Sequence, residues 1–248
     1  MREKPLLFCF PFAGGTADFY NELENACGEN IRFVKLEYSG HGKRMGEPLY
    51  RSFSEMTDDL YPQIMRERKK FSDADYALLG YSMGSIAMFD MLQRICADED
   101  GRKPRCVFLS AHQPQPIREL LNIPESGIDS WAKNRTIAAG GIDERLLHNK
   151  SFWRLYLPIF RADYQLIAAY NFEEVRFQTK IPAVVFYSEE DTPYRDMHAW
   201  TKYFVGSSEF VRFDGQHFFI HRHCREMAEI IQKKLTDEFT QGDYHELR

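Results

Sequence analysis

The stretch 76–85 constrains the fold more than any other part of the sequence. It reads Tyr-Ala-Leu-Leu-Gly-Tyr-Ser-Met-Gly-Ser, an apolar run of strand character that ends in Gly-x-Ser-x-Gly and passes directly into a helical pattern. This context is typical of a nucleophile elbow, a sharp turn that lifts one serine hydroxyl, here Ser82, above the edge of a sheet. Side chains at Gly80 and Gly84 would collide where strand and helix close on the turn. The alternative interpretation is a glycine-rich loop around an ordinary serine.

The rest of the sequence alternates short β-rich runs with helical patterns. Apolar spacing predicts helices over 52–70, with Ser52 or Ser54 as the N-terminal cap, over 86–95 and over 222–239. This alternation predicts an α/β fold, in which a mainly parallel sheet is flanked by helices on both faces. Ligands of such sheets bind at the carboxyl ends of the strands. The predicted strands are 6–10, 31–36, 76–79, 106–110, 183–188 and 209–213.

The alternation breaks in the interval 110–181, which is rich in aromatic residues. A helical pattern covers 152–170, and a structureless loop as long as this interval is uncommon. We therefore expect a helical lid at 112–178, inserted over the active site of a single domain that spans 1–248. The alternative is a helical excursion that only fills out the core. The polar end of the chain, 241–248, is expected to fray.

The composition limits which binding partners and which cellular compartment are expected for this protein. The net charge of −5 leaves no broad basic surface, which argues against nucleic acid as a partner. No apolar run approaches the roughly 18 residues of a membrane span, and the first residues do not follow a signal-peptide pattern. The five cysteines are scattered, without a Cys-x-x-Cys spacing, which favours a reducing compartment. We expect a cytoplasmic monomer that binds neither nucleic acid nor membrane.

A serine hydroxyl is a weak nucleophile at neutral pH, so Ser82 needs a histidine base and an acid that orients it. In an α/β-hydrolase fold both follow the serine in the chain, with the acid before the histidine. His217 is the candidate base, since it lies in a glycine turn directly after the last predicted strand. Asp191 is the candidate acid, since it lies far enough past the preceding strand to turn toward His217. Three other carboxylates compete for this role: Glu189, Glu190 and Asp214.

Two backbone N–H groups are also needed, to hold the oxyanion of a transition state. Met83, directly after the serine, is the first candidate donor. The second is Ala13, with Phe12 next, in the loop of small residues after the first strand. The Gly14-Gly15 pair resembles a phosphate-binding loop, but the lysine and the Ser/Thr of that motif are absent, so nucleotide binding is a weak alternative.

Histidines near the C-terminal end raise the question of a metal site. His217 and His221 have the i, i+4 spacing of zinc ligands on one helix face, and His223 and Cys224 follow them. No glutamate lies between the first two histidines, His223 would point elsewhere, and bulky apolar residues fill the gap. We therefore expect no metal. His221 and His223 are expected to lie at the start of the terminal helix without a role in the site.

Five segments match the motifs of one family, in the family's order. Residues 10–15 match its Phe-Pro-x-Ala-Gly-Gly opening, and 39–44 match its Pro-Gly-Arg/His-Gly-x-Arg loop, with serine in place of proline. The elbow at 80–84, Arg-Ala-Asp at 161–163 and Gly-Gln-His-Phe-Phe at 215–219 complete the set. The sequence thereby resembles the type II (external, editing) thioesterases of nonribosomal peptide and polyketide synthesis, which belong to the α/β-hydrolase superfamily.

The resemblance implies hydrolysis of acyl or aminoacyl thioesters on the phosphopantetheine arm of a carrier protein, which removes stalled or mis-primed chains. The Ser82 hydroxyl would attack the thioester carbon, His217 would take the hydroxyl proton, and Asp191 would orient the imidazolium. The reaction would need no metal and no diffusible cofactor. Two departures from the family are Ser-Ala-His in place of Ser-Gly-x at 110–112, and an acid loop, 189–191, without the usual glycine.

Other functions are compatible with the same three residues. A general carboxylesterase, a small acyltransferase and a medium-chain acyl-CoA or acyl-carrier-protein thioesterase would use the same chemistry, and a hydrolase-fold binding protein without activity is a further alternative. Carrier proteins are usually acidic, and this chain is itself net negative, so docking needs a local basic or apolar patch around the lid. The candidate basic residues are Arg118, Lys133, Arg135, Arg145 and Arg154.

Overall fold

The computed structural model of the chain describes residues 3–98 and 101–236. Its centre is a six-stranded sheet in the order β2-β1-β3-β4-β5-β6, and every neighbouring pair is parallel. The predicted α/β class with a mainly parallel sheet is therefore confirmed. The strands are β1 (Leu6–Phe10), β2 (Arg32–Lys35), β3 (Tyr76–Tyr81), β4 (Cys106–Ser110), β5 (Ala183–Ser188) and β6 (Ser208–Phe213).

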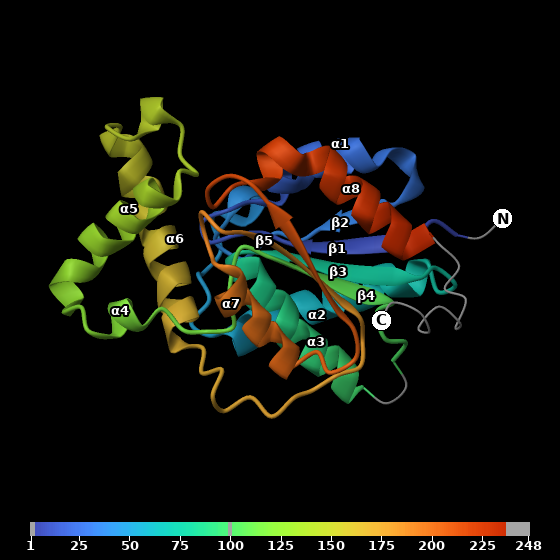
Figure 1. Cartoon of the computed structure of the whole chain (residues 1–248). Helices are drawn as coiled ribbons and strands as arrows, with labels where there is room; N and C mark the ends of the chain where they lie inside the picture. Colours follow the sequence, from blue (N-terminus) through green and yellow to red (C-terminus); the bar gives the residue numbers. More distant parts are fainter. Residues whose placement is uncertain (1–2, 99–100, 237–248) are drawn as a thin grey trace.

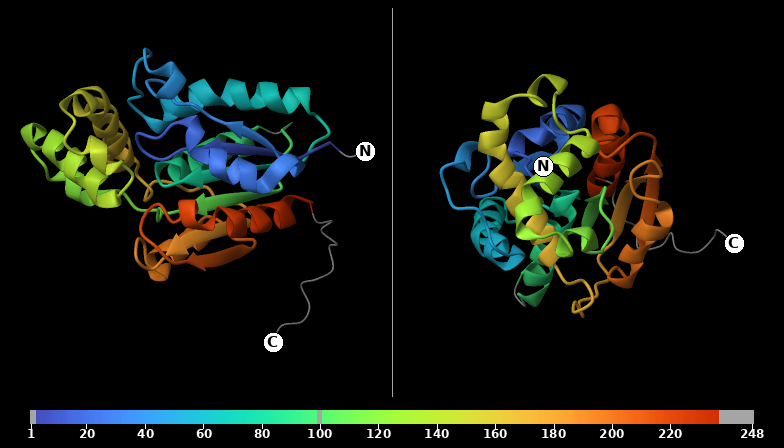
Figure 2. Two further views of the ribbon diagram at one scale, coloured as in Figure 1. Left: turned by 90° about the horizontal axis from the view of Figure 1, so that it is seen from above. Right: turned by 90° about the vertical axis from the view of Figure 1, so that its left-hand side faces the viewer.

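Helices cover both faces of this sheet (Figures 1 and 2). On one face lie α1 (Asn21–Cys27) and α8 (Ile220–Thr236), and on the other lie α2 (Phe53–Lys70) and α3 (Met83–Ala97). The strand β1 is buried on both faces, because its alternate side chains enter two separate apolar clusters. Continuous apolar strands such as β1 and β3 are the consequence of this double burial.

The helix boundaries differ slightly from those predicted. The helix α3 begins at Met83, three residues before its predicted start, and α8 begins at Ile220, two residues before its predicted start. Ser52 is the cap of α2, where its hydroxyl accepts a hydrogen bond from the Glu55 N–H at 3.1 Å. The predicted end of the last helix, 237–239, and the polar end at 241–248 lie outside the described residues.

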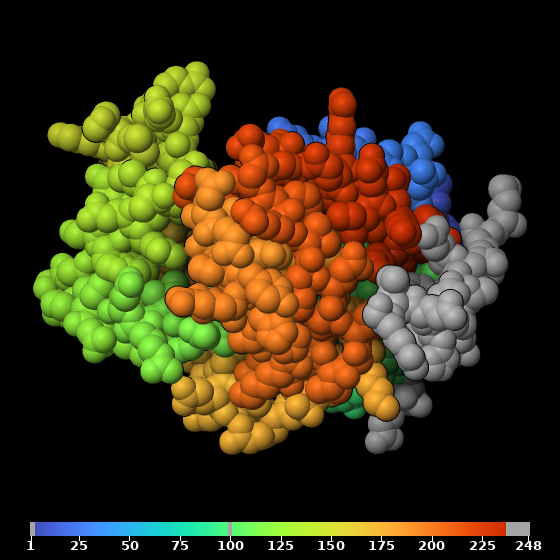
Figure 3. Space-filling model, in the orientation of Figure 1, coloured from blue at the N-terminus to red at the C-terminus, as the bar shows by residue number. Residues whose placement is uncertain are grey.

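The segment between β4 and β5 is helical and lies at one end of the molecule (Figures 1 and 3). It carries α4 (Arg118–Leu121), α5 (Ile128–Ala139) and α6 (Lys150–Ala169), and the short α7 (Tyr194–Met197) follows β5. The remaining 3₁₀ turns are Ala17–Tyr20, Gly28–Asn30, Gly42–Arg44, Glu125–Gly127, Glu144–Leu146 and His198–Lys202. None of the helices in the described ranges is both long and apolar enough to cross a membrane.

The turn between β3 and α3 depends on two glycines. A Cβ atom on Gly84 would overlap the carbonyl oxygen of Phe10 in β1, and one on Gly80 would overlap the backbone of Gly84. The absence of these side chains lets the first turn of α3 pack directly on the sheet. Ser82, between them, has φ 54° and ψ −120°, a conformation that side-chain-bearing residues adopt only under constraint.

We predict that Gly84→Ala destabilises the protein by about 1–3 kcal/mol, because its methyl group displaces α3 from β1. Urea unfolding measures this change. The matched control is Gly46→Ala, since Gly46 has open space where a Cβ would lie and no positive φ. The control is expected to stay within about 0.5 kcal/mol of wild type. Equal stability of both variants would contradict this account of the turn.

Candidate active site

Three side chains from separate loops meet at the carboxyl edge of the sheet. Ser82 follows β3, Asp191 follows β5 and His217 follows β6. The Ser82 Oγ lies 2.9 Å from His217 Nε2, and His217 Nδ1 lies 2.9 Å from Asp191 Oδ1. Parallel strands bring these loops together, because all their carboxyl ends lie on one edge.

The direction of these hydrogen bonds fixes the histidine tautomer. The Asp191 carboxylate can only accept, so the His217 Nδ1–H donates to it. This leaves the lone pair of His217 Nε2 facing the Ser82 hydroxyl, which has a proton to donate. The arrangement can remove the hydroxyl proton as the oxygen attacks an electrophile, which is the chemistry of acyl transfer.

The competing carboxylates have other partners. Glu190 accepts the Gly215 N–H at 3.0 Å and so ties the loop that carries Asp191 to the loop that carries His217. Glu189 accepts the Tyr194 N–H, and Asp214 forms an ion pair with His223 at 2.7 Å. Of the four carboxylates that the sequence offered, Asp191 is the one that contacts the His217 ring.

Tyr81, which lies directly before the serine, contributes to the site although its role was not predicted from the sequence. Its hydroxyl donates to the His217 carbonyl at 2.7 Å and accepts the Ile220 N–H at 3.4 Å, so it fixes the backbone of the loop that carries His217. Burial raises the pKa of Tyr81 well above its usual value, which keeps the hydroxyl protonated as a donor. A tyrosine at the end of a buried strand, directly before the serine, was the available signal.

The two predicted oxyanion donors lie beside the serine. Met83 is the first residue of α3, where backbone N–H groups have no partner within the helix. Ala13 and Phe12 line the same cavity as Ser82. The neighbouring Gly14 N–H is bound to the Asp163 carboxylate at 2.6 Å, so it is not available to a ligand.

A cavity of about 370 Å³ opens beside Ser82 and His217. Its walls come from the sheet edge and from the segment between β4 and β5, which contributes side chains of α5 and α6. The lining from these helices includes Arg135, Thr136, Ala139, Phe160, Tyr164 and Ile167. The volume and the mixed polar and apolar lining suit a small or medium-sized acyl group with polar attachments.

His112 is a buried histidine on the wall of this cavity. Burial lowers the pKa of His112 to about 4, although the hydrogen bond between its Nδ1 and the Gln113 carbonyl at 2.5 Å opposes the shift. The preceding Ala111 has a φ of 55°, a conformation that glycine adopts more readily than alanine. His112 therefore presents a neutral ring to the cavity.

The histidines near the start of α8 have carboxylate partners of their own. His221 pairs with Glu22 at 3.0 Å, and His223 lies within reach of Asp214 and Glu226. No group of three His, Cys, Asp or Glu side chains placed to hold a metal ion occurs within residues 3–98 and 101–236.

The candidate docking residues have different surroundings. Arg118 pairs with Glu173 at 2.9 Å, and Arg145 pairs with Asp143 at 2.6 Å. Lys133 lies 4.9 Å from the centre of the Trp153 ring, and Arg154 is exposed. The remaining candidate, Arg135, lines the cavity that contains Ser82.

Known proteins share this fold. ClbQ, from the colibactin NRPS/PKS pathway, has a TM-score of 0.80 at 25% identity over 94% of this chain and 97% of its own. The RedJ thioesterase of the prodiginine pathway in Streptomyces coelicolor has a TM-score of 0.81 at 22% identity, over 94% of this chain and 91% of its own. The parallel sheet and the strand-to-helix turn define an α/β-hydrolase fold.

The family follows from the sequence comparison. The model of the thioesterase domain matches residues 5–235, so the chain belongs to the thioesterase family. The protein named linear gramicidin dehydrogenase LgrE, from Brevibacillus parabrevis, is 28% identical over 239 residues, which are 93% of this chain and 87% of that protein. The resemblance found in the sequence is therefore confirmed at the level of the family.

We predict that Asp191→Asn lowers kcat on the order of 10⁴-fold, because an amide can present its N–H₂ to His217 and favour the wrong tautomer. Steady-state turnover of an acyl thioester measures this effect. Glu190→Gln is the matched control, because it makes the same change in the neighbouring residue and keeps an acceptor for the Gly215 N–H. The control should retain activity within about tenfold. A larger loss in the Glu190 variant would transfer the acid role to Glu190.

We predict that His112 makes the fold sensitive to acid. Unfolded His112 binds a proton below pH 6.5, whereas the folded form does so only near pH 4, so stability falls as pH drops through this window. The contribution reaches about 3 kcal/mol at the acid end. Urea unfolding between pH 7 and pH 4 should show a steeper loss for wild type than for His112→Gln. Parallel curves would contradict the assignment.

Proposed function

We propose that the protein hydrolyses acyl or aminoacyl thioesters on the phosphopantetheine arm of a carrier protein, and that it removes stalled or mis-primed chains in nonribosomal peptide or polyketide synthesis. The observation that carries the proposal is the 2.9 Å contact between Ser82 Oγ and His217 Nε2 beside the cavity, in a chain of the thioesterase family. ClbQ is described as part of an NRPS/PKS pathway, and RedJ as a thioesterase of a biosynthetic pathway, which supports the same setting here.

In the proposed reaction Ser82 is the nucleophile. His217 takes the proton of the Ser82 hydroxyl as the oxygen attacks the thioester carbon, and Asp191 stabilises the imidazolium that forms. The backbone N–H groups of Met83 and Ala13 hold the oxyanion, a contribution worth about 3 kcal/mol for each donor. The imidazolium of His217 gives the proton from Ser82 to the departing sulfur, which leaves as the thiol. His217 then deprotonates the water that attacks the acyl group on Ser82, and it returns that proton to the Ser82 oxygen as the carboxylic acid leaves.

The segment 112–178 is the lid of this site in our proposal, inserted in a single domain. Its helices α5 and α6 supply side chains to the cavity wall, which supports a role in enclosing the acyl group. We further propose that the enzyme acts as a monomer in the cytoplasm. All five cysteines are free thiols in the structure, which agrees with a reducing compartment.

Arg135 is the docking candidate that the geometry favours. It lines the cavity, and no ion pair neutralises it among the described residues. A cation at this position can attract the phosphate of the pantetheine arm as the thioester approaches Ser82. Arg118 and Arg145 each have a carboxylate partner, which makes them weaker candidates.

Matched substrates test the proposed function. Purified enzyme should release the acyl group from acyl-carrier protein and from the corresponding acyl-CoA, and Ser82→Ala should lower both rates by at least about 10³-fold. An oxygen ester with the same acyl group, and with an alcohol of similar size, should turn over more slowly. Fast cleavage of the ester without release from either thioester would instead assign the protein as a carboxylesterase.

A further inference from the structure

A second buried pair of histidine and aspartate lies outside the proposed triad. Asp163 of α6 is 2% exposed, and His41 of the loop after β2 is 1% exposed. The Asp163 Oδ2 atom lies 2.9 Å from His41 Nε2 and 2.6 Å from the backbone nitrogen of Gly14. One oxygen atom thus joins three segments that are distant in sequence: the loop after β1, the loop after β2, and the helix α6.

The surroundings of His41 favour protons on both ring nitrogens. Its Nδ1 faces the carbonyl oxygen of Ser39 at 3.0 Å, and its Nε2 faces the Asp163 carboxylate. Both partners are acceptors, so an ionised Asp163 is matched by an imidazolium at His41. Burial lowers the pKa of His41, but the charge of Asp163 and the two hydrogen bonds outweigh it, so that the pKa of His41 is raised. The two opposite charges compensate each other in a buried position.

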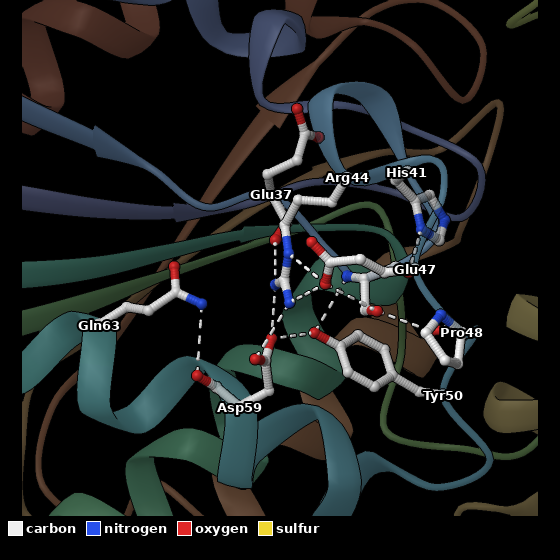
Figure 4. Close-up of polar contacts among 9 residues, drawn as sticks. Glu37, His41, Arg44, Glu47, Pro48, Tyr50, Asp59 and Gln63 are labelled. Carbon is white, nitrogen blue, oxygen red and sulfur yellow. Dashed lines mark hydrogen bonds and ion pairs between the residues drawn. The ribbon is translucent and has the colours of Figure 1, made fainter.

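The loop that carries His41 is fixed by its own polar contacts (Figure 4). Arg44 pairs with Asp59 of α2 at 2.6 Å, and the Tyr50 hydroxyl donates to Asp59 at 2.5 Å. The same Tyr50 oxygen accepts the Ser39 N–H at 3.1 Å. Ser39, whose carbonyl faces His41 Nδ1, is therefore linked through Tyr50 to Asp59 of α2. His41 has little freedom to move away from Asp163.

Gly14 is held tightly on the other side of the carboxylate. Its φ is +74°, and a Cβ atom there would overlap the ring of Phe160, which lies one turn before Asp163 on α6. The N–H that Asp163 accepts belongs to the peptide unit between Ala13 and Gly14. Fixing the plane of this unit limits the orientations of the adjacent Ala13 residue, whose own N–H is the proposed oxyanion donor.

We propose that Asp163, held by His41, is a positioning residue that fixes the oxyanion loop 10–15 in its active geometry. This inference rests on the proposed function, because it takes the Ala13 N–H as an oxyanion donor. Asp163 acts through Gly14 and does not touch the reacting atoms. Because Asp163 belongs to α6, the position of this helix is coupled to the geometry of the oxyanion loop.

An amide cannot replace the Asp163 carboxylate. The Oδ2 position receives hydrogen bonds from both Gly14 and His41. An asparagine oxygen at this position would leave the His41 imidazolium without a counter-charge, and an asparagine N–H₂ would face the Gly14 N–H, which is also a donor. Asp163→Asn therefore weakens the anchor of the loop in either orientation while it keeps the size of the side chain.

The test uses the Asp163→Asn variant of this chain and two inhibitors. An alkyl boronic acid accepts the Ser82 oxygen and forms a tetrahedral anion that the oxyanion donors must hold. A thioether analogue of acyl-CoA occupies the same cavity without forming this anion. We expect kcat to fall on the order of 10²-fold and the inhibition constant of the boronic acid to rise by a similar factor, whereas KM and thioether binding stay within about threefold.

Asp129→Asn is the matched control. Asp129 lies on α5, is exposed and pairs with Arg161 at 3.0 Å, so the control removes one carboxylate charge from the same segment without touching the oxyanion loop. It should match wild type in all four quantities. His41→Gln is a second variant, for the case that Asp163→Asn does not fold, and it should shift kcat and boronic acid affinity in the same direction.

Wild-type kcat and boronic acid affinity in folded Asp163→Asn, whatever its melting temperature, would overturn the proposal, since the pair would then be structural only. If Asp163→Asn does not fold, wild-type values in His41→Gln would have the same consequence. Failure of the proposed function is a separate result: wild type would then cleave no thioester, while its affinity for the boronic acid could still be compared with that of the variants.

Discussion

The close packing of α3 against β1 is the contact on which the rest of the site depends. Gly84 lets the first turn of α3 reach the carbonyl of Phe10, and this contact requires the tight turn in which Ser82 has a positive φ. Phe10 is also the first residue of the loop 10–15, which carries the proposed oxyanion donor Ala13. One backbone contact therefore sets both the position of Ser82, the proposed nucleophile, and the start of the loop that faces it.

The structure contains two pairs of histidine and aspartate whose surroundings give them different abilities. His217 and Asp191 have side chains that are 17% and 15% exposed, and the second ring nitrogen of His217 faces a hydroxyl that can donate a proton. His41 and Asp163 are fully buried, and both ring nitrogens of His41 face acceptors. The first pair can accept a proton during a reaction. In the second pair both ring nitrogens of His41 are engaged with acceptors inside the protein, which suits the pair to an anchor.

Local features of the sequence were predictable, and so was the long-range meeting of Ser82, Asp191 and His217, because the chain order of a known fold covers it. Long-range contacts that no such rule covers were not predictable. Three strands, including β1 and β4, have their predicted bounds, because their apolar runs are buried on both faces and end at clear turn signals. The start of α3 at Met83 was missed, since packing on the sheet, and not helix propensity, extends the helix to the elbow. The roles of Tyr81 and Asp163 were also missed. Asp163 meets His41 across 122 residues of sequence, and no spacing rule predicts such a contact.

The central claim is that the reaction passes through an acyl group on Ser82. Rapid acid quenching of enzyme mixed with acyl-carrier protein, followed by peptide mapping with mass spectrometry, tests it directly. We expect the mass of the acyl group on the peptide that contains Ser82, and none on this peptide in the Ser82→Ala variant. Acylation of one of the five free cysteines during productive turnover, with an unmodified Ser82 peptide, would contradict the account.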